Sequence, residues 1–537
     1  MRYLDANVRL GRYNDWSGRE PISVEHLLRV MDHDGIHEAL VVDSLAYEYH
    51  AADGNERILQ VTAGHPRLHP AWVGLPPGSR ELPPPADWLA EMEERGVRAV
   101  YLYPAQYDFS LEDWGVDRYL APLAERRVPV FICPDASPGG RRSPGGPWRE
   151  QDLTDWSGVV RLCGAFPNLP VIVVEKRISY LLRTMYAALE ACPNLHVELS
   201  TLWLHHLVEF ICREWGAQRL LFGSGLPYRD PAAVLGQLNY ADITPGEMAL
   251  IAGENLRRLL SWSEQEPLPH PTVQFPEPLD ELHEIARHLK PLRGQGFHCS
   301  HGHVGRTVYL HIPDAEPREL VAEMDRLGVQ RGIVFTNGGL NSDEVYGNDV
   351  VAAAVREYPQ RFIGFVSANL HRAPEEVRRE LQRGFAMGMV GIKLHPAFSD
   401  YDTNGPQVDL ACAYANERKC IIINHDWGST ERMLTLCHQY PDACLITGHT
   451  SPQAVPAVKQ VDNLYIGTCP LNSYGITEKL VEEVGADRLV FGSDLSWDPV
   501  GWGIGPILYA RIGLEAKRAI LGGNIRRLLL RYGQSRA

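Results

Sequence analysis

The second half of the chain carries histidines and one aspartate whose types and spacing suit a metal ion. His301 and His303 stand two residues apart, so they face the same way if they lie on a β-strand. Further along the chain stand Lys393, His395, His425, His449 and Asp494. Imidazole and carboxylate groups are the ligands that borderline metals such as zinc prefer. One His-x-His pair is weak evidence in a chain with 21 histidines, so the argument depends on the whole set converging.

Each of these residues stands at the end of a short apolar run that is typical of a buried strand. In the second half, such runs lie at 296–304, 331–335, 362–366, 390–394, 420–424, 443–447, 464–467 and 488–492. Amphipathic stretches such as 317–327, 373–384 and 475–484 separate them and predict helices. Apolar strands that alternate with helices indicate a parallel sheet covered on both faces. About eight such units predict an α/β fold, a (β/α)8 barrel with its functional side chains at the carboxyl ends of the strands.

The first half repeats the same scaffold. Residues 222–226 (FGSGL) match 491–495 (FGSDL), and 255–260 (NLRRLL) match 524–529 (NIRRLL) at the same offset. Strands are expected at 3–8, 38–42, 68–73, 97–102, 128–133, 171–174, 195–199 and 219–223. A repeat of this length predicts two tandem (β/α)8 TIM-like barrels.

The first copy lacks the groups that could do chemistry. At the positions of His301, His303, His395, His425, His449 and Asp494 it has, in the same order, Asn7, Arg9, Tyr103, Pro134, Glu175 and Gly225. Because the scaffold is kept while every candidate group is replaced, we expect the first barrel to be a degenerate, metal-free copy. In the alternative, Asp5, Arg9 and Glu175 form a new site.

The motifs of the second half resemble the amidohydrolase superfamily and, within it, the amidohydrolase-2 group, which is similar to aminocarboxymuconate semialdehyde decarboxylase. They are 300–305 (SHGHVG), 391–396 (GIKLHP), 424–425 (NH), 447–450 (TGHT), 491–494 (FGSD) and 523–528 (GNIRRL). The resemblance covers nearly all of the second half but only the scaffold of the first. The group usually has an acidic residue two positions before the first histidine. Here that residue is Cys299, whereas the first copy has Asp5.

The resemblance implies one divalent metal, expected to be zinc, held by His301, His303, His425 and Asp494. It also implies that His449 is the acid/base that deprotonates a metal-bound water, with Asp494 taking part in proton transfer. Such a water has a pKa of about 7, which a histidine with a pKa of roughly 6.5 can serve. Lys393 is expected to be a charge partner in the barrel core. In the alternative it is carboxylated and bridges a second metal.

Four further residues are candidates for substrate contacts. His395 ends the fourth strand and would face the substrate. Arg306 follows the first strand, and its planar guanidinium suits a carboxylate, although a solvated loop arginine is an equal interpretation. Trp427 and Trp497 follow His425 and Asp494 and would either wall an apolar pocket or pack the loops.

Two reactions fit these residues. In the first, a metal-dependent hydrolase uses metal-bound water to attack the carbonyl of an amide, lactone or imide in a small molecule. In the second, the same metal serves non-oxidative decarboxylation of an unsaturated or aromatic carboxylic acid. A third hypothesis, a metal-dependent binding or scaffold protein without enzymatic activity, is disfavoured by the intact set of candidate ligands. The fold does not separate hydrolysis from decarboxylation.

A proline-rich stretch at 263–293 separates the two copies and contains one short helical pattern at 279–289. Proline fixes φ and removes amide donors, so this stretch is expected to be an extended linker. The predicted regions are therefore 1–262, 263–293 and 294–537. Enzymes of the resembling group commonly form homodimers. We expect the two barrels to imitate such a pair within one chain, with further homo-oligomers as an open alternative.

Composition narrows the choice of partner and compartment. The net charge of −15 and the lack of basic clusters argue against nucleic acid or an anionic membrane as partner. No signal peptide and no uninterrupted apolar stretch of roughly 18 residues are seen, which predicts a cytoplasmic protein. The ten cysteines contain no C-x-x-C motif and are expected to be free, buried thiols.

Overall fold

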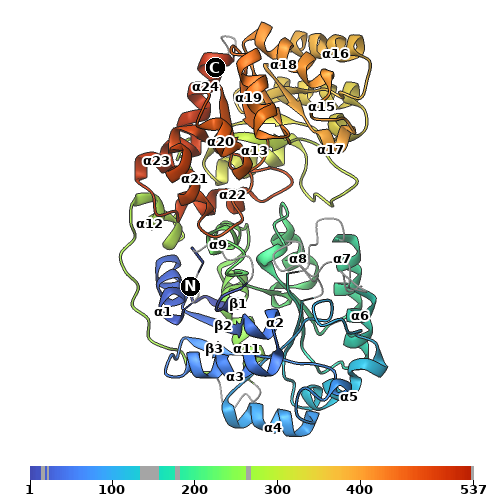
Figure 1. Cartoon of the computed structure of the whole chain (residues 1–537), viewed down its shortest axis with the longest axis vertical. Coiled ribbons are helices and arrows are strands. Elements are labelled where there is room, and N and C mark those ends of the chain that lie inside the picture. Colours follow the sequence, from blue (N-terminus) through green and yellow to red (C-terminus); the bar gives the residue numbers. More distant parts are fainter. Residues whose placement is uncertain (14–18, 21–22, 134–155, 176–181, 262–267, 534–537) are drawn as a thin grey trace. The chain divides into compact units, whose positions relative to one another are not determined.

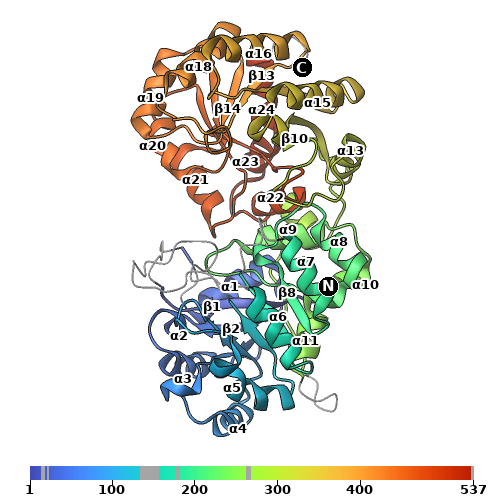
Figure 2. The same ribbon diagram turned by 90° about the vertical axis from the view of Figure 1, so that its right-hand side faces the viewer.

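The computed structural model describes residues 1–13, 19–20, 23–133, 156–175, 182–261 and 268–533 (Figure 1). Its contacts divide the chain into two compact units. Unit 1 consists of Met1–Trp203 and Leu207–Pro278, and unit 2 of Leu204–His206 and Leu279–Ala537. Each unit has parallel strands surrounded by helices (Figures 1 and 2), which confirms the predicted α/β fold with two tandem barrels.

Unit 2 contains an eight-stranded parallel sheet in which the strands pair in chain order, from β10 to β17. The first and last strands close the ring, because Gly302 bridges Leu495 and the amide of Asp494 donates to the carbonyl of His301 at 3.0 Å. The strands are β10 (Phe297–His303), β11 (Val329–Phe335), β12 (Phe362–Ser367), β13 (Gly391–Leu394), β14 (Ile421–Asn424), β15 (Cys444–Thr447), β16 (Leu464–Gly467) and β17 (Leu489–Val490).

Apart from α12, which precedes β10, the helices of unit 2 follow the strands along the chain. Side chains such as Phe335, Phe365, Ile423 and Ile446 fill the core of the unit. The helices are α12 (Glu281–Arg287), α13 (Pro317–Arg326), α14 (Asn337–Asn341), α15 (Glu344–Glu357), α16 (Pro374–Ala386), α17 (Pro396–Ser399), α18 (Pro406–Arg418), α19 (Thr430–Gln439), α20 (Val455–Val458), α21 (Ile476–Val484), α22 (Val500–Leu508), α23 (Leu514–Arg518) and α24 (Asn524–Tyr532).

Unit 1 forms the same ring from two sheets, β1–β3 and β4–β9. Only Ala71 separates β3 from β4, and the amide of Arg9 on β1 donates to the carbonyl of Leu226, beyond β9, at 2.9 Å. The strands are β1 (Leu4–Leu10), β2 (Glu38–Asp43), β3 (Leu68–Pro70), β4 (Trp72–Val73), β5 (Val100–Leu102), β6 (Val130–Ile132), β7 (Val171–Val173), β8 (Leu195–Glu198) and β9 (Leu220–Leu221).

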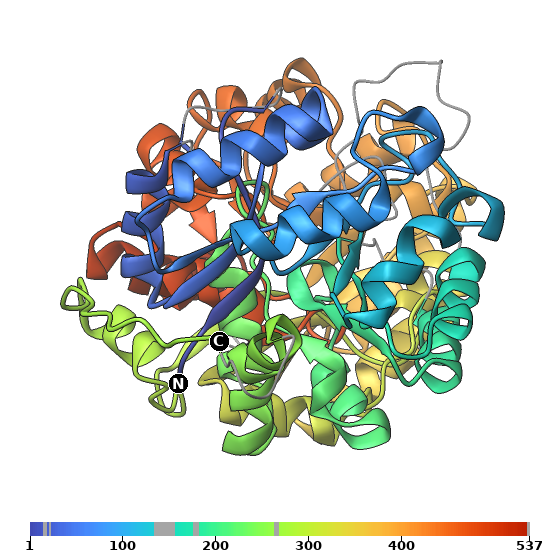
Figure 3. The ribbon, with the colours of Figure 1, turned by 90° about the horizontal axis from the view of Figure 1, so that it is seen from below.

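The helices of unit 1, coloured blue to green in Figure 3, cover these strands. They are α1 (Val24–Asp34), α2 (Leu45–Glu48), α3 (Ala51–Thr62), α4 (Pro85–Arg95), α5 (Asp113–Glu125), α6 (Trp156–Ala165), α7 (Leu182–Ala191), α8 (Leu207–Trp215), α9 (Pro231–Asn239), α10 (Pro245–Ala249) and α11 (Asn255–Leu260). Local sequence sets their ends. The hydroxyl of Ser23 accepts from His26 N and caps α1, and Gly35 ends that helix in the left-handed conformation that glycine adopts freely.

Part of the predicted linker is packed against unit 1. The described residues of the stretch begin at Leu268, which is buried in the core of unit 1. The guanidinium of Arg257 donates to the carbonyls of Leu268 and Pro269 at 3.0 and 3.2 Å. The predicted helix at 279–289 is present as α12.

All ten cysteines are buried and free, which confirms the expectation of unpaired thiols. Among the helices of the described residues, none combines the length and the apolar character that crossing a bilayer requires.

Candidate metal centre

Three predicted ligands meet where the barrel of unit 2 closes. His301 and His303 lie at the carboxyl end of β10, and Asp494 follows β17. The Oδ1 atom of Asp494 lies 2.9 Å from Nε2 of His303 and 3.4 Å from Nε2 of His301. One donor atom from each of the three residues lies within 4.8 Å of the other two. All three side chains are buried.

The donor atoms of this centre fit a divalent cation. Asp494 Oδ1 is buried and makes no hydrogen bond, although two imidazole nitrogens are close to it. Burial opposes ionisation of Asp494, but the adjoining imidazoles of His301 and His303, polar even when neutral, hold its pKa well below the usual value. Burial lowers the pKa of both imidazoles, so they are neutral at neutral pH. A carboxylate facing two neutral imidazoles is the protonation state that binds zinc or a similar metal.

His449 lies beside the three ligands. Its ring centroid is 5.2 Å from that of His301, and a second group of possible donors joins His449, Cys469 and Asp494. The Nδ1 atom of His449 is 2.9 Å from the carbonyl oxygen of Cys469, which can only accept a hydrogen bond. The proton of His449 therefore sits on Nδ1, and Nε2 carries a free lone pair. Burial lowers the pKa of His449 to about 4, although Asp494 opposes the shift.

His425 and His395 form the neighbouring part of the site. Their rings stack at a centroid distance of 3.8 Å, and His425 lies edge-on to His449 at 4.3 Å. His425 is not among the three residues whose donor atoms converge within 4.8 Å. The Nδ1 atom of His395 accepts from the amide of Phe398 at 3.2 Å, so its proton is on Nε2.

The other predicted substrate contacts occupy different surroundings. Trp497 is near the centre, with its ring 6.0 Å from that of His303. Trp427 is fully buried and donates its indole N–H to the carbonyl of Ile446 at 2.9 Å. Arg306 is largely exposed and pairs with Glu316 at 2.8 Å.

Lys393 lies in the core directly beneath the centre. Its side chain is fully buried, and its Nζ atom is 3.3 Å from Nε2 of His301 and 4.5 Å from the ring centroid of Phe335. Burial lowers the pKa of Lys393 to about 8, although the charge of Asp494 opposes the shift. This ammonium group packs on the aromatic face of Phe335, and its expected role as a charge partner in the barrel core stays a prediction.

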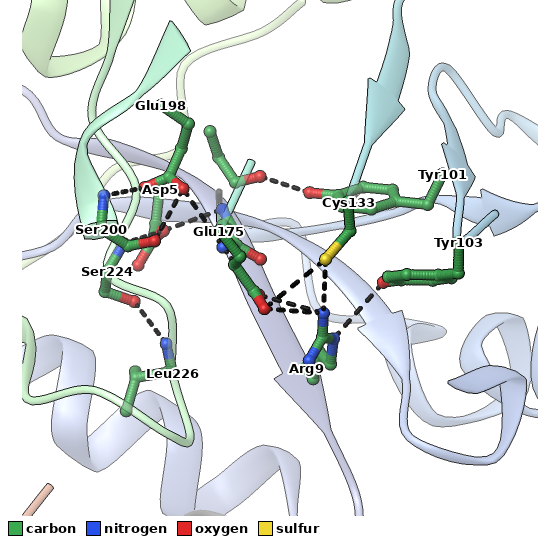
Figure 4. Close-up of polar contacts among 12 residues, drawn as sticks. Asp5, Arg9, Tyr101, Tyr103, Cys133, Glu175, Glu198, Ser200, Ser224 and Leu226 are labelled. Atoms are coloured by element: carbon green, nitrogen blue, oxygen red, sulfur yellow. Dashed lines mark hydrogen bonds and ion pairs between the residues drawn. The ribbon is translucent and has the colours of Figure 1, made fainter. Parts of the chain in front are cut away.

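Unit 1 has an internal cation at the corresponding place (Figure 4). Arg9, aligned with His303, donates to Glu175, aligned with His449, at 3.0 Å. Its guanidinium also lies 4.6 and 5.1 Å from the ring centroids of Tyr47 and Tyr103. Gly225, aligned with Asp494, offers no side chain. Pro134, aligned with His425, lies outside the described residues.

Comparison with known proteins identifies the family. The amidohydrolase family model matches residues 19–262 and 305–531. The chain belongs to the amidohydrolase family. The matched segments include most of both units, and within the family the motifs are those of the amidohydrolase-2 group.

Several solved structures are similar to one half of the chain. An uncharacterized TIM-barrel protein from Bordetella bronchiseptica is 18% identical, with 44% of this chain and 99% of that chain covered and a TM-score of 0.37. A 5-carboxyvanillate decarboxylase from Sphingomonas paucimobilis is 16% identical, with 44% and 98% covered and a TM-score of 0.37. A dihydroxybenzoic acid decarboxylase from Polaromonas sp. JS666, with bound manganese and an inhibitor, is 18% identical, with 44% and 97% covered and a TM-score of 0.33.

Sequence reasoning did not predict the roles of three further residues at this site. Cys469 follows β16, the seventh strand, at the same barrel end as the other donors. Asp498 is buried, and burial together with the charge of Asp494 raises its pKa well above the usual value. Cys299 accepts from the amides of Ser493 and His301 at 3.2 and 3.4 Å. Cys469 stands two residues after β16 and Asp498 eight residues after β17, so a search of eight positions beyond each strand end for His, Cys, Asp and Glu would have found both.

Cys299 performs the supporting role that an acid has in unit 1. Asp5, at the aligned position, accepts from the amides of Ser224 and Asn7 at 2.8 and 3.0 Å. Both side chains thus tie the first strand to the loop after the last strand. In unit 2, the Cys299 thiol thus makes the connection between the first strand and the last loop that a carboxylate makes in unit 1.

Proposed function

We propose that unit 2 is a zinc-dependent hydrolase with one metal ion, acting on the amide, lactone or imide carbonyl of a small molecule. The observation that carries this proposal is the convergence of His301, His303 and Asp494 around a carboxylate oxygen with no hydrogen-bond partner. His425 is the proposed fourth ligand. A divalent cation held there would polarise a carbonyl and lower the pKa of a coordinated water to about 7.

His449 is the proposed acid/base. The hydrogen bond from its Nδ1 to the Cys469 carbonyl fixes the ring and leaves the Nε2 lone pair available to accept a proton. Its low pKa keeps the imidazole neutral before each turnover, so it starts as a base. Asp494 stands within the same group of donors and can orient the proton that is transferred.

His395 is the proposed substrate contact. Because its Nδ1 accepts from the Phe398 amide, its Nε2–H is a donor that suits a carbonyl oxygen. Phe398 stacks on His395 at 4.0 Å and lies 6.1 Å from Trp497. These two aromatic rings would cover an apolar or aromatic part of the substrate. Arg306 and Trp427 receive no support as substrate contacts from their observed partners.

The reaction is tested by measuring base consumption and CO₂ release on the same zinc-loaded protein. The panel contains amides, lactones, imides and unsaturated or aromatic carboxylic acids. Hydrolysis of a lactone or an imide releases a proton and so consumes base, hydrolysis of an amide releases an amine, and none of these reactions releases CO₂. Each activity should disappear in the H449A variant. Release of CO₂ from the acids, with no hydrolysis of the other classes, would replace this proposal by decarboxylation at the same centre.

We further propose that unit 1 does no chemistry and is retained as the partner of unit 2, in the way that subunits pair in a homodimer. A metal-free copy would persist if it covered an apolar face of the active one. Expression of residues 290–537 alone tests this role. The fragment should aggregate or lose most of its activity, and a soluble, monomeric and fully active fragment would refute the proposal.

A further inference from the structure

A small apolar cavity lies at the amino ends of the strands in unit 2, the opposite end of the barrel from the metal centre. Its volume is about 120 Å³. Apolar side chains line it, namely Val355, Phe362, Ile363, Val390 and Leu529, and one cation joins them, Arg331. Arg331 is the third residue of β11, whereas the ligands His301 and His303 stand at the carboxyl end of β10.

The guanidinium of Arg331 has no anionic partner among the residues that the structure describes. Its Nε atom is buried and makes no hydrogen bond. Burial lowers the pKa of Arg331, and no neighbouring carboxylate opposes this shift. Leaving a half-buried charge without a partner costs free energy, which an anion delivered from solution would recover.

The duplication shows which group is missing. Glu38 in unit 1 stands at the position of Arg331, and its carboxylate forms ion pairs with Arg257 and His69. The sequence alignment places Arg526 at the position of Arg257. Unit 2 therefore keeps the cation of this pair and has a second cation where unit 1 has the carboxylate.

The third member of the unit 1 cluster is also replaced. In unit 1, His69 is the register partner of Leu40 on β2, and in unit 2, Ile363 is the register partner of Ile333 on β11. Leu40 follows Ala39 and Ile333 follows Gly332, and because Ala39 and Gly332 are aligned, Leu40 and Ile333 are aligned as well. Ile363 thus takes the place of His69 and lines the cavity. The polar cluster of unit 1 has become a cavity with an apolar wall and a cationic rim.

A further group beside this rim contributes no negative charge. His298 is the register partner of Arg331 on β10. Burial lowers the pKa of His298, and the charges of Arg526 and Arg331 lower it further. A neutral imidazole beside two guanidinium groups leaves the group formed by His298, Arg331 and Arg526 with a net positive charge.

We propose that this cavity binds a small monocarboxylic acid with a compact apolar body. The carboxylate pairs with Arg331 and supplies the negative charge that Glu38 provides in unit 1, and the apolar body enters the cavity beside Ile363 and Phe362. A planar carboxylate matches the fork of a guanidinium, and the apolar lining adds the free energy of burying hydrocarbon. This site does not depend on the proposed hydrolysis at the metal centre.

The test is isothermal titration calorimetry of the full-length, zinc-loaded protein with hexanoate, 1-hexanol and inorganic phosphate. Hexanoate should bind about tenfold or more tightly than either of the others, because only hexanoate has both the charge and the chain. Equal binding of hexanol would show an apolar cavity without anion recognition. Equal binding of phosphate would show an anion site without a use for the cavity. Either result would overturn the proposal.

Two variants locate the binding. R331Q removes the charge from a half-exposed position and should weaken hexanoate about tenfold or more, while V355F should fill the cavity and do the same with Arg331 intact. The matched control is R361Q, because Arg361 lies at the same barrel end but pairs with Asp325 at 2.6 Å. R361Q should bind hexanoate as the wild type does. Unchanged binding in both R331Q and V355F would place hexanoate elsewhere and refute the site.

Discussion

At the carboxyl ends of the barrel strands, the same scaffold has residues that fit a metal ion in unit 2 and an internal guanidinium in unit 1. In unit 2, two imidazoles and the carboxylate of Asp494 face one another and fit a metal ion. In unit 1, the aligned strand carries Arg9, whose guanidinium pairs with Glu175. A covalently attached cation thus stands in unit 1 where unit 2 has residues that fit an exchangeable one. A barrel can lose metal chemistry in this way without leaving an uncompensated charge in its core.

The backbone of this loop is the same in both units. Asp494 has φ of 60° and Gly225 has φ of 72°, both in the left-handed region. Glycine adopts this conformation without strain, whereas an aspartate there is less favourable. Unit 2 accepts this conformation and gains a carboxylate at the centre. Unit 1 has glycine at this position, so the same conformation is adopted there without that strain.

The largest effect is expected from D494N. The amide keeps the shape of the side chain but removes its negative charge from the donor group, so turnover should fall by about 10³-fold or more. Steady-state assays on the substrate found in the panel measure this loss. D462N, the same substitution at a fully exposed aspartate of unit 2, is the matched control and should keep full turnover. Near-wild-type activity in D494N would remove Asp494 from the centre.

The two central histidines should separate in their effects on metal content. H449A should keep the metal and lose about 10²- to 10⁴-fold in activity, because it removes an acid/base group. H425A should lose both metal and activity, because it removes the proposed fourth ligand. Elemental analysis beside activity assays distinguishes them. Equal metal loss in both variants would show that His449 is itself a ligand.

In unit 1, the expected effect of the internal cation is on stability. R9M leaves the Glu175 carboxylate buried without its partner, which should destabilise unit 1 by about 3–5 kcal/mol. The double variant R9M/E175L removes both charges and should recover most of that loss. Hydrogen exchange of the unit 1 strands, followed by mass spectrometry, reports the change. A double variant as unstable as R9M would show that the packing of Arg9 on Tyr47 and Tyr103, not charge, is what matters.

A smaller effect concerns the pH dependence of unit 1. Burial raises the pKa of Glu198 to about 8, so the native state holds a proton that the unfolded chain releases above about pH 4.5. Stability should therefore fall as pH rises from about 4.5 to 8, by roughly 4 kcal/mol from this group. E198Q should flatten that slope, and E94Q, at an exposed site, should not. Hydrogen exchange at pH 5 and 8 measures this change of stability with pH. The same change in E198Q and in the wild type would contradict the account.

Strand positions follow closely from the sequence because buried parallel strands are continuous apolar runs. The run predicted at 464–467 is β16, and that at 362–366 is β12 with one more residue. The run at 68–73 is divided into β3 and β4, since the amide of Ala71 donates to Val41 while that of Trp72 donates to Ala99. This change of partner depends on long-range geometry that local periodicity does not contain.

The site was predictable where a strand positions the residue and less so where a loop does. His301 and His303 converge with Asp494 because the ends of neighbouring parallel strands meet at one face of the barrel. Arg306 and Trp427 stand on loops, and the structure places one on the surface and the other in the core. Cys469 and Asp498 belong to none of the motifs, and although a search beyond the strand ends would include them, only the structure shows that they lie beside Asp494.

The most direct test of the central claim is the metal content of the full-length chain. Inductively coupled plasma mass spectrometry on zinc-supplemented, extensively dialysed protein should give one metal per chain. The H301A/H303A variant should fall to none, whereas N7A/R9A, changed at the aligned positions of unit 1, should still contain one. Two metals per wild-type chain, none at all, or loss in N7A/R9A with retention in H301A/H303A would contradict the account of one active and one silent barrel.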